Sequence, residues 1–600
     1  MITSTYSFAV TSSIGYRNTN YERRTTSNGP VLHSNSEGGF VLPLVLLGMV
    51  ILMALIIGAA MTSYGSRIQA VQTKSQTEAM LAAEAGYEQA IFWMSQRTDL
   101  LGDIQAGDGQ GSINFGTGRC DYEINFHGFI GARPVFRVTS TGVCGRPSFT
   151  RVVDVDVMQE TSGWAMGTCR IPSGTTSTTE VYFKNSEIVD MPLHINKCDD
   201  HPDVRDIWIS TSGGHPRFLQ KVEMGESRKA GSTDKYGATI ISYFENGIAF
   251  DQPGVRITDE TAIQSKVNRF RNSTAAAYKF TPVGTASFGG GTTKYDAVQL
   301  EFFVESGVGK VRITNNCSVK GRNANDYDYK VVRGSGGDTF EKYKIYDYHC
   351  RPNSETQTTI VIDNNSSPCY VKQTFPGGYE SAPGGQIYVK GSVVIGSSTY
   401  TDMVVKGKIT VVAEKKDDGT GGHIWIADSI KVDGAHDADG KPSANNPNVL
   451  GLIAQGVIKV VNPTDSSHSN PHSQTYQPIG ITKSGCSSGR FMPNPTVVEA
   501  AITVGGGGWG AEDVGDRREY SNDDCDGSGN HHDDLIVRGS ITEVVRGVVG
   551  LFNSSGDTVE GYSKYYYIDT RLMSGILPGD IWFSGKYIPA PAGWHDHSPD

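Results

Sequence analysis

The sequence predicts a chain of mixed α+β and all-β class. We expect a long N-terminal membrane-spanning helix, a small β-sheet head, and a large passenger like a right-handed parallel β-helix. Three observations predict this fold. An uncharged apolar segment near the N-terminus continues into helix-forming sequence, short alternating strands with glycine-rich turns follow it, and similar strands recur in the last third of the chain. The 72 glycines and the 20% of charged residues suit such a turn-rich protein.

The apolar segment is long enough to cross a membrane. No residue is charged over the 29 positions between Glu37 and Arg67. A helix needs roughly 20 apolar residues to span a bilayer, whereas the apolar core of a secretory signal peptide has about 7–15. We therefore expect a transmembrane stretch at about residues 40–61 and an extracytoplasmic location for everything after it.

The small residues of this segment precede its apolar core. In a secretory signal peptide the small-residue cleavage site follows the core, but here Gly38 and Gly39 come before it. Cleavage after Gly39 would leave a mature chain that begins at Phe40 and keeps its membrane helix. We expect residues 1–39 to be a leader; the alternative is an uncleaved signal anchor with a periplasmic domain.

The helix is expected to continue well past the membrane, over residues 40–98. No proline occurs between Pro43 and Pro134, and the sequence after the apolar segment is rich in Ala, Gln, Glu and Met, which favour helix. At 1.5 Å per residue such a helix is about 85 Å long. Its second half carries one apolar stripe at helical spacing, formed by Met80, Ala83, Tyr87, Ala90, Ile91 and Met94.

The segment GGFVLPLVLLGMVILMAL, followed by AMLAAEAGYEQAI, resembles the N-terminal region of type IV pilins, and most closely the PilX-type segment of pilus-assembly proteins. The resemblance implies that a prepilin peptidase cuts between Gly39 and Phe40, that the new N-terminus is methylated, and that the helix packs among other pilin subunits. It also implies residence in the inner membrane before assembly into a filament at the cell surface.

One position departs from the pilin pattern. Most pilins carry a glutamate at the fifth mature position, which is Leu44 in this chain. That carboxylate is thought to pair with a neighbouring N-terminus during assembly. Its absence resembles minor pilins located at the filament tip and the K-type pseudopilin of type II secretion. We therefore expect a tip-type subunit.

Short strands follow the helix. The runs YEIN, VFRVTSTGV and TRVVDVDVM alternate apolar and polar residues, as half-buried strands do, and turns such as GDGQGS separate them. We predict a small β-sheet head over residues 99–160 that packs on the second half of the helix.

The passenger is predicted in two parts, a β-rich region at 161–384 and a β-helix-like region at 385–600. Similar strands recur there as YVKGSVVI, VVKGKITV, WIADSIKV, IAQGVIKV and IVRGSITE. The first three begin 16 and 21 residues apart, a plausible coil length for an irregular parallel β-helix. Stacked coils would place one set of residues in a single core: Val389, Val393, Val405, Ile409, Ile426 and Ile430. A β-sandwich with similar strands is the alternative.

Three phrases extend the resemblance to large PilX-type proteins along the passenger. They are DMPLHINK, NVLGLIAQGVIKV, and RGSITEVVRGVVG followed by YSKYYYIDTRLMSGILPG. The chemistry of these phrases does not follow from the resemblance, and we interpret His194 in the first of them as a buried turn residue.

All nine cysteines follow the apolar segment, and none forms a CxxC pair. Outside the cytoplasm disulfides are expected. Sequence neighbours suggest the pairs Cys120–Cys144, Cys169–Cys198, Cys350–Cys369 and Cys486–Cys525, with Cys317 left over, although sequence alone does not fix the pairing.

The best candidate for a ligand site is the acidic segment SNDDCDGSGNHHDD. Its alternating oxygen-bearing residues followed by a glycine resemble the first half of a calcium loop, but the twelfth position is Leu535 where a bidentate glutamate is expected. The candidate Ca²⁺ ligands are Asp524, Asp526, Ser528, Asp533 and Asp534. A second acidic loop offers Asp433, Asp437 and Asp439. The alternative interpretation, which we favour for both loops, is an acid-rich solvated turn.

Composition and motifs limit the remaining functions. The net charge of −11 and the absence of a basic stripe argue against nucleic acid as a partner. The chain has no GxSxG, HExxH, Walker or dinucleotide-binding motif, so we expect no enzyme. The sequence predicts a minor, tip-type pilin-like subunit that acts in assembly, priming or adhesion to a surface or host ligand. The alternatives are a K-type pseudopilin and a membrane-anchored surface adhesin outside any filament.

Overall fold

A computed structural model describes most of the chain after residue 40. The described residues are 41–97, 100–116, 118–130, 133–145, 148–159, 165–168, 181–196, 207–209, 214–252, 260–283, 292–323, 329–334, 337–350, 357–362, 370–371, 384–396, 403–461, 481–482, 490–491, 495–505, 508–512, 532–543, 547–552, 558–574 and 587–598. The structure has the long N-terminal helix and the mostly β-strand body that the sequence predicts.

A single helix, α1, runs over Val41–Ser95, and a short second helix, α2, follows at Leu100–Gln105. Pro43 lies in the first turn of α1, where a missing N–H breaks no hydrogen bond within the helix. The side chains from 41 to 64 are exposed, whereas buried positions recur every three or four residues from Ser75 onward. The helix therefore has two halves of different character, which we call its first half (41–71) and its second half (74–95).

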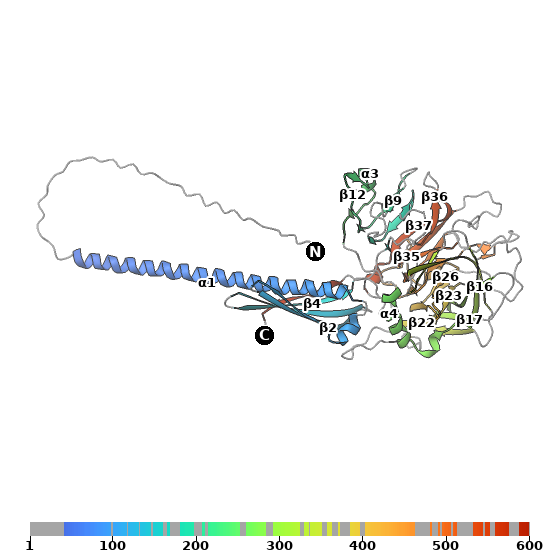
Figure 1. Cartoon of the computed structure of the whole chain (residues 1–600), viewed down its shortest axis with the longest axis horizontal. Helices are drawn as coiled ribbons and strands as arrows, with labels where there is room; N and C mark the ends of the chain where they lie inside the picture. The colour runs from blue at the N-terminus through green and yellow to red at the C-terminus, as the bar shows by residue number, and fades with distance from the viewer. Residues whose placement is uncertain are drawn as a thin grey trace. The chain divides into compact units, whose positions relative to one another are not determined.

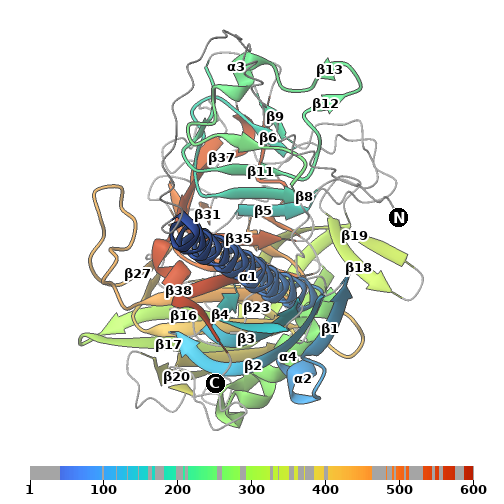
Figure 2. The same cartoon turned by 90° about the vertical axis from the view of Figure 1, so that its left-hand side faces the viewer.

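The head is built from the second half of α1 and a five-stranded antiparallel sheet of order β1-β2-β3-β4-β38. Strands β2 and β4 lie along α1 in Figure 1, and Figure 2 shows β1 to β4 side by side. The strands are β1 (Gln110–Phe115), β2 (Gly118–Ile130), β3 (Arg133–Cys144), β4 (Phe149–Gln159) and β38 (Tyr587–His597).

The last strand of the head lies at the other end of the sequence. β38 pairs with β4 from Tyr587↔Gln159 to His597↔Val152. The range 99–160 predicted for the head is therefore too short, and the predicted passenger range that ends at 600 is too long. The pattern PAPAG within β38 hides the strand, because two prolines and a bulge interrupt its alternation.

The core of the head forms where the sequence predicts it. Ala83, Tyr87, Ala90 and Met94 are buried against the sheet, and Met80 and Ile91 pack at the edge of the same cluster. The partners from the sheet are Tyr122, Ile124, Phe136, Val138, Val153, Val155 and Val157. The helical stripe predicted from residue spacing is thus the face that α1 turns to the head.

The passenger, residues 165–574, consists mainly of parallel ladders. The first ladder joins ten strands in the spatial order β15-β22-β25-β28-β33-β35-β5-β8-β11-β14, all parallel. Figure 2 shows β5, β8 and β11 side by side. Their bounds are β15 (Lys279–Phe280), β22 (Gly384–Lys390), β25 (Lys408–Glu414), β28 (Val449–Ala454), β33 (Ala501–Val504), β35 (His532–Glu543), β5 (Ala165–Thr168), β8 (Leu193–Asn196), β11 (Val222–Met224) and β14 (Ile248–Ala249).

Two further ladders run beside the first. The second joins β16-β23-β26-β29-β34. β6 and β9 form a separate parallel pair. The third joins β24-β27-β32-β35-β37-β7-β10. Their bounds are β16 (Thr292–Glu305), β23 (Ser392–Ile395), β26 (Ile424–Ile426), β29 (Ile458–Val460), β34 (Trp509–Ala511), β6 (Val181–Phe183), β9 (Ile207–Ile209), β24 (Met403–Val405), β27 (Ile430–Val432), β32 (Thr496–Val498), β37 (Thr558–Ile568), β7 (Ile188–Asp190) and β10 (Arg217–Phe218).

The order of strands in these ladders differs from their order in the sequence. Ala165 of β5 pairs with Ile541 of β35, and Asp190 of β7 pairs with Tyr567 of β37. We call these two pairings the seam. β35 pairs with Ile568 at Gly539 and with Ala165 at Ile541. Ala165 thus lies where the chain would continue if it ran on directly from Ile568. β5 and β37, the first and the last strand of the passenger, therefore both lie directly beside β35.

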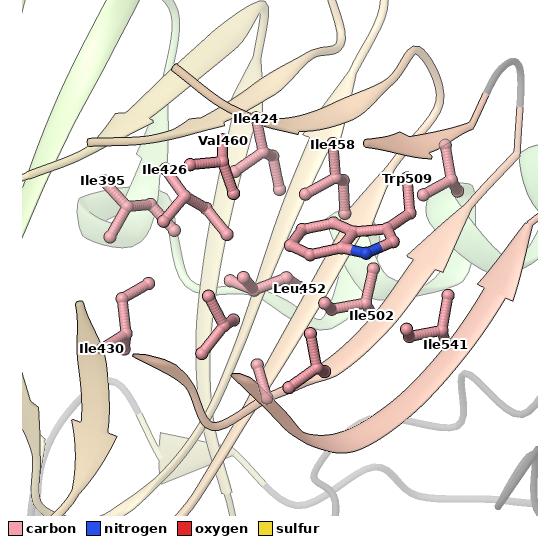
Figure 3. Packing of buried hydrophobic residues seen from close by; sticks show 14 of the residues in the cluster. Ile395, Ile424, Ile426, Ile430, Leu452, Ile458, Val460, Ile502, Trp509 and Ile541 are labelled. Atoms are coloured by element: carbon pink, nitrogen blue, oxygen red, sulfur yellow. The ribbon is translucent and has the colours of Figure 1, made fainter. Parts of the chain in front are cut away.

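The inward side chains of the ladders form one large apolar core. Figure 3 shows Ile395, Ile426, Leu452, Ile502 and others from successive strands pointing toward one another, with Trp509 among them. All six residues predicted to share a core do so: Val389, Val393, Val405, Ile409, Ile426 and Ile430.

Helix α4 (Glu260–Ser273) covers part of the outer face of the first ladder. Its Ile263, Val267 and Phe270 pack on Tyr388, Val412 and Ile453. The remaining elements are β12 (Lys229–Ala230), β13 (Thr233–Asp234), α3 (Ala238–Ile241), η1 (Ala276–Tyr278), β17 (Val308–Asn323), β18 (Tyr329–Gly334), β19 (Gly337–Cys350), β20 (Gln357–Val361), β21 (Tyr370–Val371), β30 (Ile481–Thr482), β31 (Arg490–Phe491), β36 (Gly550–Phe552) and η4 (Thr570–Ser574).

Candidate assembly site on the N-terminal helix

The first half of α1 presents an apolar surface on every face. Its large side chains are 47–70% exposed from Val41 to Met61, with Leu42 and Met61 at the upper end. Leaving such a side chain in water forgoes about 1.5–3 kcal/mol relative to burial. Within the described residues, α1 is the one helix long and apolar enough to cross a membrane. An apolar environment therefore suits this surface, and none of the described residues covers it.

Two hydroxyl side chains of the first half bond to the backbone of their own helix. The hydroxyl of Thr62 donates to the carbonyl of Gly58 at 2.8 Å, and that of Ser66 donates to the carbonyl of Thr62 at 2.9 Å. Hydroxyls bonded back to the preceding turn need no water, so they are compatible with lipid or with a packed helix bundle. The first charge of the helix comes at Arg67.

The second half of α1 lies very close to the sheet because small residues meet there. A methyl group added at Gly142 of β3 would lie 2.1 Å from the carbonyl oxygen of Ala79 and 2.4 Å from the amide nitrogen of Ala83. One added at Gly86 would lie 2.2 Å from the hydroxyl oxygen of Ser140. The AAEAG motif thus forms a close contact between helix and sheet, which we call the small-residue contact. Its partners on the sheet were not identified from the sequence.

The position of Leu44 is described, and that of the cleavage site is not. Leu44 is 66% exposed on the first turns of α1. Gly39 and Phe40 lie outside the described residues, so cleavage between them stays a prediction.

The cysteine pairing differs from the prediction. Cys317 of β17 and Cys350 of β19 face each other in the antiparallel ladder and form a disulfide with a Cα–Cα distance of 4.1 Å. The predicted pair Cys350–Cys369 with Cys317 left over is therefore wrong. Proximity along the sequence misled the assignment, because the antiparallel pairing of β17 with β19, which β18 separates in sequence, brings together two residues 33 positions apart. The pairs involving Cys169, Cys198, Cys486 and Cys525 lie outside the described residues.

The predicted disulfide in the head is also absent from the structure. Cys120 and Cys144 are buried thiols on β2 and β3. Cys120 pairs in register with Gly142, two positions from Cys144, so the two cysteines are not directly opposite. The thiol of Cys144 lies 3.6 Å from a carboxylate oxygen of Glu78 on α1. Burial raises the pKa of the Cys120 thiol, which disfavours the reactive thiolate.

His194 is buried as predicted, but it lies on strand β8 and not in a turn. Its side chain is 2% exposed; Nδ1 lies 3.3 Å from Glu223 and Nε2 lies 3.0 Å from the side-chain oxygen of Asn196. These contacts occupy both ring nitrogens within the protein.

The acidic residues do not gather into a metal site within the described part of the chain, where no group of three His, Cys, Asp or Glu side chains has suitable geometry. Asp437 accepts hydrogen bonds from the backbone N–H groups of Asp439 and Lys441, and Asp433 faces Lys406 at 3.8 Å. Of the first loop, Asp533 and Asp534 belong to β35, in register with Tyr562 and Ser563.

The other proposed ligands, Asp524, Asp526 and Ser528, lie outside the described residues, so calcium binding by that loop stays a prediction.

Comparisons with known proteins add little beyond the geometry. No protein-family model matches the chain, and no curated protein is significantly similar. Among solved structures, the chain is similar to the competence-associated pilin ComZ from Thermus thermophilus, with a TM-score of 0.26 and 12% identity over 87% of this chain and 98% of that one. A similarity of this degree carries no argument, and the functional case rests on the helix and the head.

Proposed function

We propose that this chain is a pilin-like subunit that is held in the inner membrane by the first half of α1 and then joins a type IV pilus or a related filament. The observation that carries the proposal is the division of α1: an apolar half, with no charge before Arg67, whose large side chains stay exposed among the described residues, followed directly by a half that packs on an antiparallel sheet. A membrane and a bundle of like helices are the two environments that suit the first half.

The dimensions support membrane residence. The stretch from Val41 to Met61 is about 31 Å long at 1.5 Å per residue, close to the roughly 30 Å of a bilayer core. A prepilin peptidase that cuts after Gly39 would place the new N-terminus at the start of this stretch. The exposed Leu44 offers no carboxylate to the N-terminus of a subunit below it, which favours a position at the filament tip and few copies per filament.

We further infer that the three ladders of the passenger form a right-handed parallel β-helix displayed by the head. The parallel pairing and the shared inward core support this interpretation. A tip subunit with such a passenger suits a role in assembly, priming or adhesion.

The test is the composition of filaments sheared from cells that carry the tagged full chain. We expect the subunit at a small fraction of the major subunit, and shortened or absent filaments when its gene is deleted. A Gly39→Glu variant, in which the residue before the cut is no longer small, should stay in the membrane and be missing from filaments.

Three other results would change the proposal. Copy numbers equal to those of the major subunit would contradict the tip position. Copurification with secretion components and loss of secreted proteins would favour a K-type pseudopilin. An uncleaved chain confined to membranes, with normal filaments after deletion, would favour a surface adhesin.

A further inference from the structure

The head sheet is completed by a strand, β38, that is synthesised only after the whole passenger. Roughly 430 residues, including the whole passenger, separate Gln159 at the end of β4 from its partner Tyr587 at the start of β38. The other strands of the head follow one another with short connections. β38 is therefore the one strand of this sheet whose docking depends on a distant part of the chain.

β38 makes contacts that the head needs. Ile588 and Ala590 pack with Val135 and Met158, and the ring of Trp594 meets the edge of Tyr87 on α1 at 5.2 Å between centroids. Asp596 forms an ion pair with Arg151 at 2.6 Å. Without β38, β4 would become an open edge, and the contact of Tyr87 with Trp594 would be lost.

The folded passenger brings its own two ends together. At the seam, β5 and β7 stack on β35 and β37 although the sequence places them at opposite ends of the passenger. A buried ion pair crosses the seam: Lys564 lies 3.4 Å from Glu187, and both side chains are at most 4% exposed. Because every coil carries a similar apolar pattern, one charged pair in the core distinguishes this stacking from others.

A second link crosses the same seam from outside. Lys441, in the loop after β27, reaches Asp190 of β7 at 2.9 Å and also lies over the ring of Tyr567. Asp190 in turn accepts a hydrogen bond from Gln220 at 2.8 Å. Through Lys441, these contacts link β7, near the start of the passenger, to β37, near its end.

Chain statistics give the consequence of this topology. The cost of closing a flexible loop rises as (3/2)RT ln n, so pairing β38 with β4 across about 430 unfolded residues is about a thousandfold less favourable than across a four-residue turn. A folded passenger removes this penalty, because β5 and β37 at its two ends already lie beside the same strand, β35.

We propose that β38 is a closing strand that couples the head to the passenger: the head sheet is complete only in a molecule whose passenger has folded. The consequence for assembly, that molecules with an unfolded passenger have a defective head and are excluded from filaments, rests on the proposed function. The coupling itself does not, and it can be measured in the isolated full chain.

The first test is hydrogen exchange, followed by peptide mass spectrometry, on the full chain in detergent. Leu452→Asp introduces a charge into the passenger core, where Leu452 is fully buried. We expect exchange in β38 and β4 to accelerate together with the passenger, by up to about a thousandfold for β38. Ala444→Asp adds the same charge at an exposed loop position and should leave all protection unchanged. Rapid exchange throughout the passenger with wild-type protection of β38 would overturn the coupling.

A second variant tests the closing strand in a folded passenger. A chain that ends at residue 586 lacks β38 but retains every passenger element. We expect β4 to lose protection while β22, β25 and β28 keep theirs. If β4 remains as protected as in the full chain, β38 does not complete the head, and the proposal fails even if the subunit is found in filaments.

Discussion

The first half of α1 carries exposed Leu, Ile, Val and Met on all sides, whereas the second half buries one face, made of small residues together with Tyr87 and Met94. The large side chains of the first half are exposed within the chain. In the second half, small residues allow the helix backbone to touch the sheet. One continuous helix therefore has a half that packs inside the molecule and a half whose large side chains stay exposed among the described residues.

The largest expected effect comes from a charge in the first half. Val50→Arg places a guanidinium near the middle of the uncharged stretch, where insertion into a membrane costs about 2.5–3.5 kcal/mol. We expect the membrane-bound fraction in cells to fall sharply, as measured by fractionation. Leu81→Arg, at a position 57% exposed in the second half, should leave the membrane-bound fraction unchanged. Equal effects of the two variants would contradict the division of the helix.

A single added methyl group should have the opposite pattern: it should destabilise the contact of the second half of α1 and have no effect in the first half. Gly142→Ala forces a methyl against the backbone of α1 at the small-residue contact, and overpacking of this kind costs about 1–3 kcal/mol. We expect the free energy of unfolding of the head to fall by that amount in denaturant titrations in detergent. Gly58→Ala, which has no atom within 4 Å of the added methyl, is the control and should leave the head unchanged.

The smallest expected effect is a pH dependence of the stability of the head. Hydrogen bonds from Arg137 to both carboxylate oxygens of Asp156, each 2.8 Å, lower the pKa of Asp156. A carboxyl group with a lowered pKa stabilises the fold above its unfolded pKa of about 3.9, and this contribution is lost as the pH falls through the folded value. Acid should therefore weaken the head below about pH 4.

Asp156→Asn tests this assignment. We expect it to destabilise the head by about 1 kcal/mol near neutral pH and to flatten the acid limb of the stability curve. An acid limb as steep as in the wild type would assign the dependence to other carboxyl groups.

The sequence predicted the local features of this fold well. The helical stripe at Tyr87 and Met94 and the repeated strands around Val389 and Ile426 depend on spacing within a few residues, and the structure buries them as predicted. Periodicity reports which face of an element is apolar. It does not report which distant element covers that face.

The features that the sequence did not predict are long-range. The return of β38 to β4, the seam between β5 and β35, and the Cys317–Cys350 disulfide each join residues that no local pattern links. Successive strands of a ladder carry nearly interchangeable apolar patterns, so the sequence of one strand does not indicate its position in the ladder. The disulfide follows from the register between β17 and β19, two strands that are not consecutive in sequence, and this register is set by the pairing of whole strands.

The measurement that tests the central claim most directly is the N-terminal sequence of the mature protein, taken from membranes and from sheared filaments. If the first half of α1 is a pilin-type assembly helix, both fractions should contain a chain that begins at Phe40, the residue directly before the described start of α1 at Val41. A chain that begins at Met1 in both fractions, or a mature terminus within the body of α1, would contradict the account.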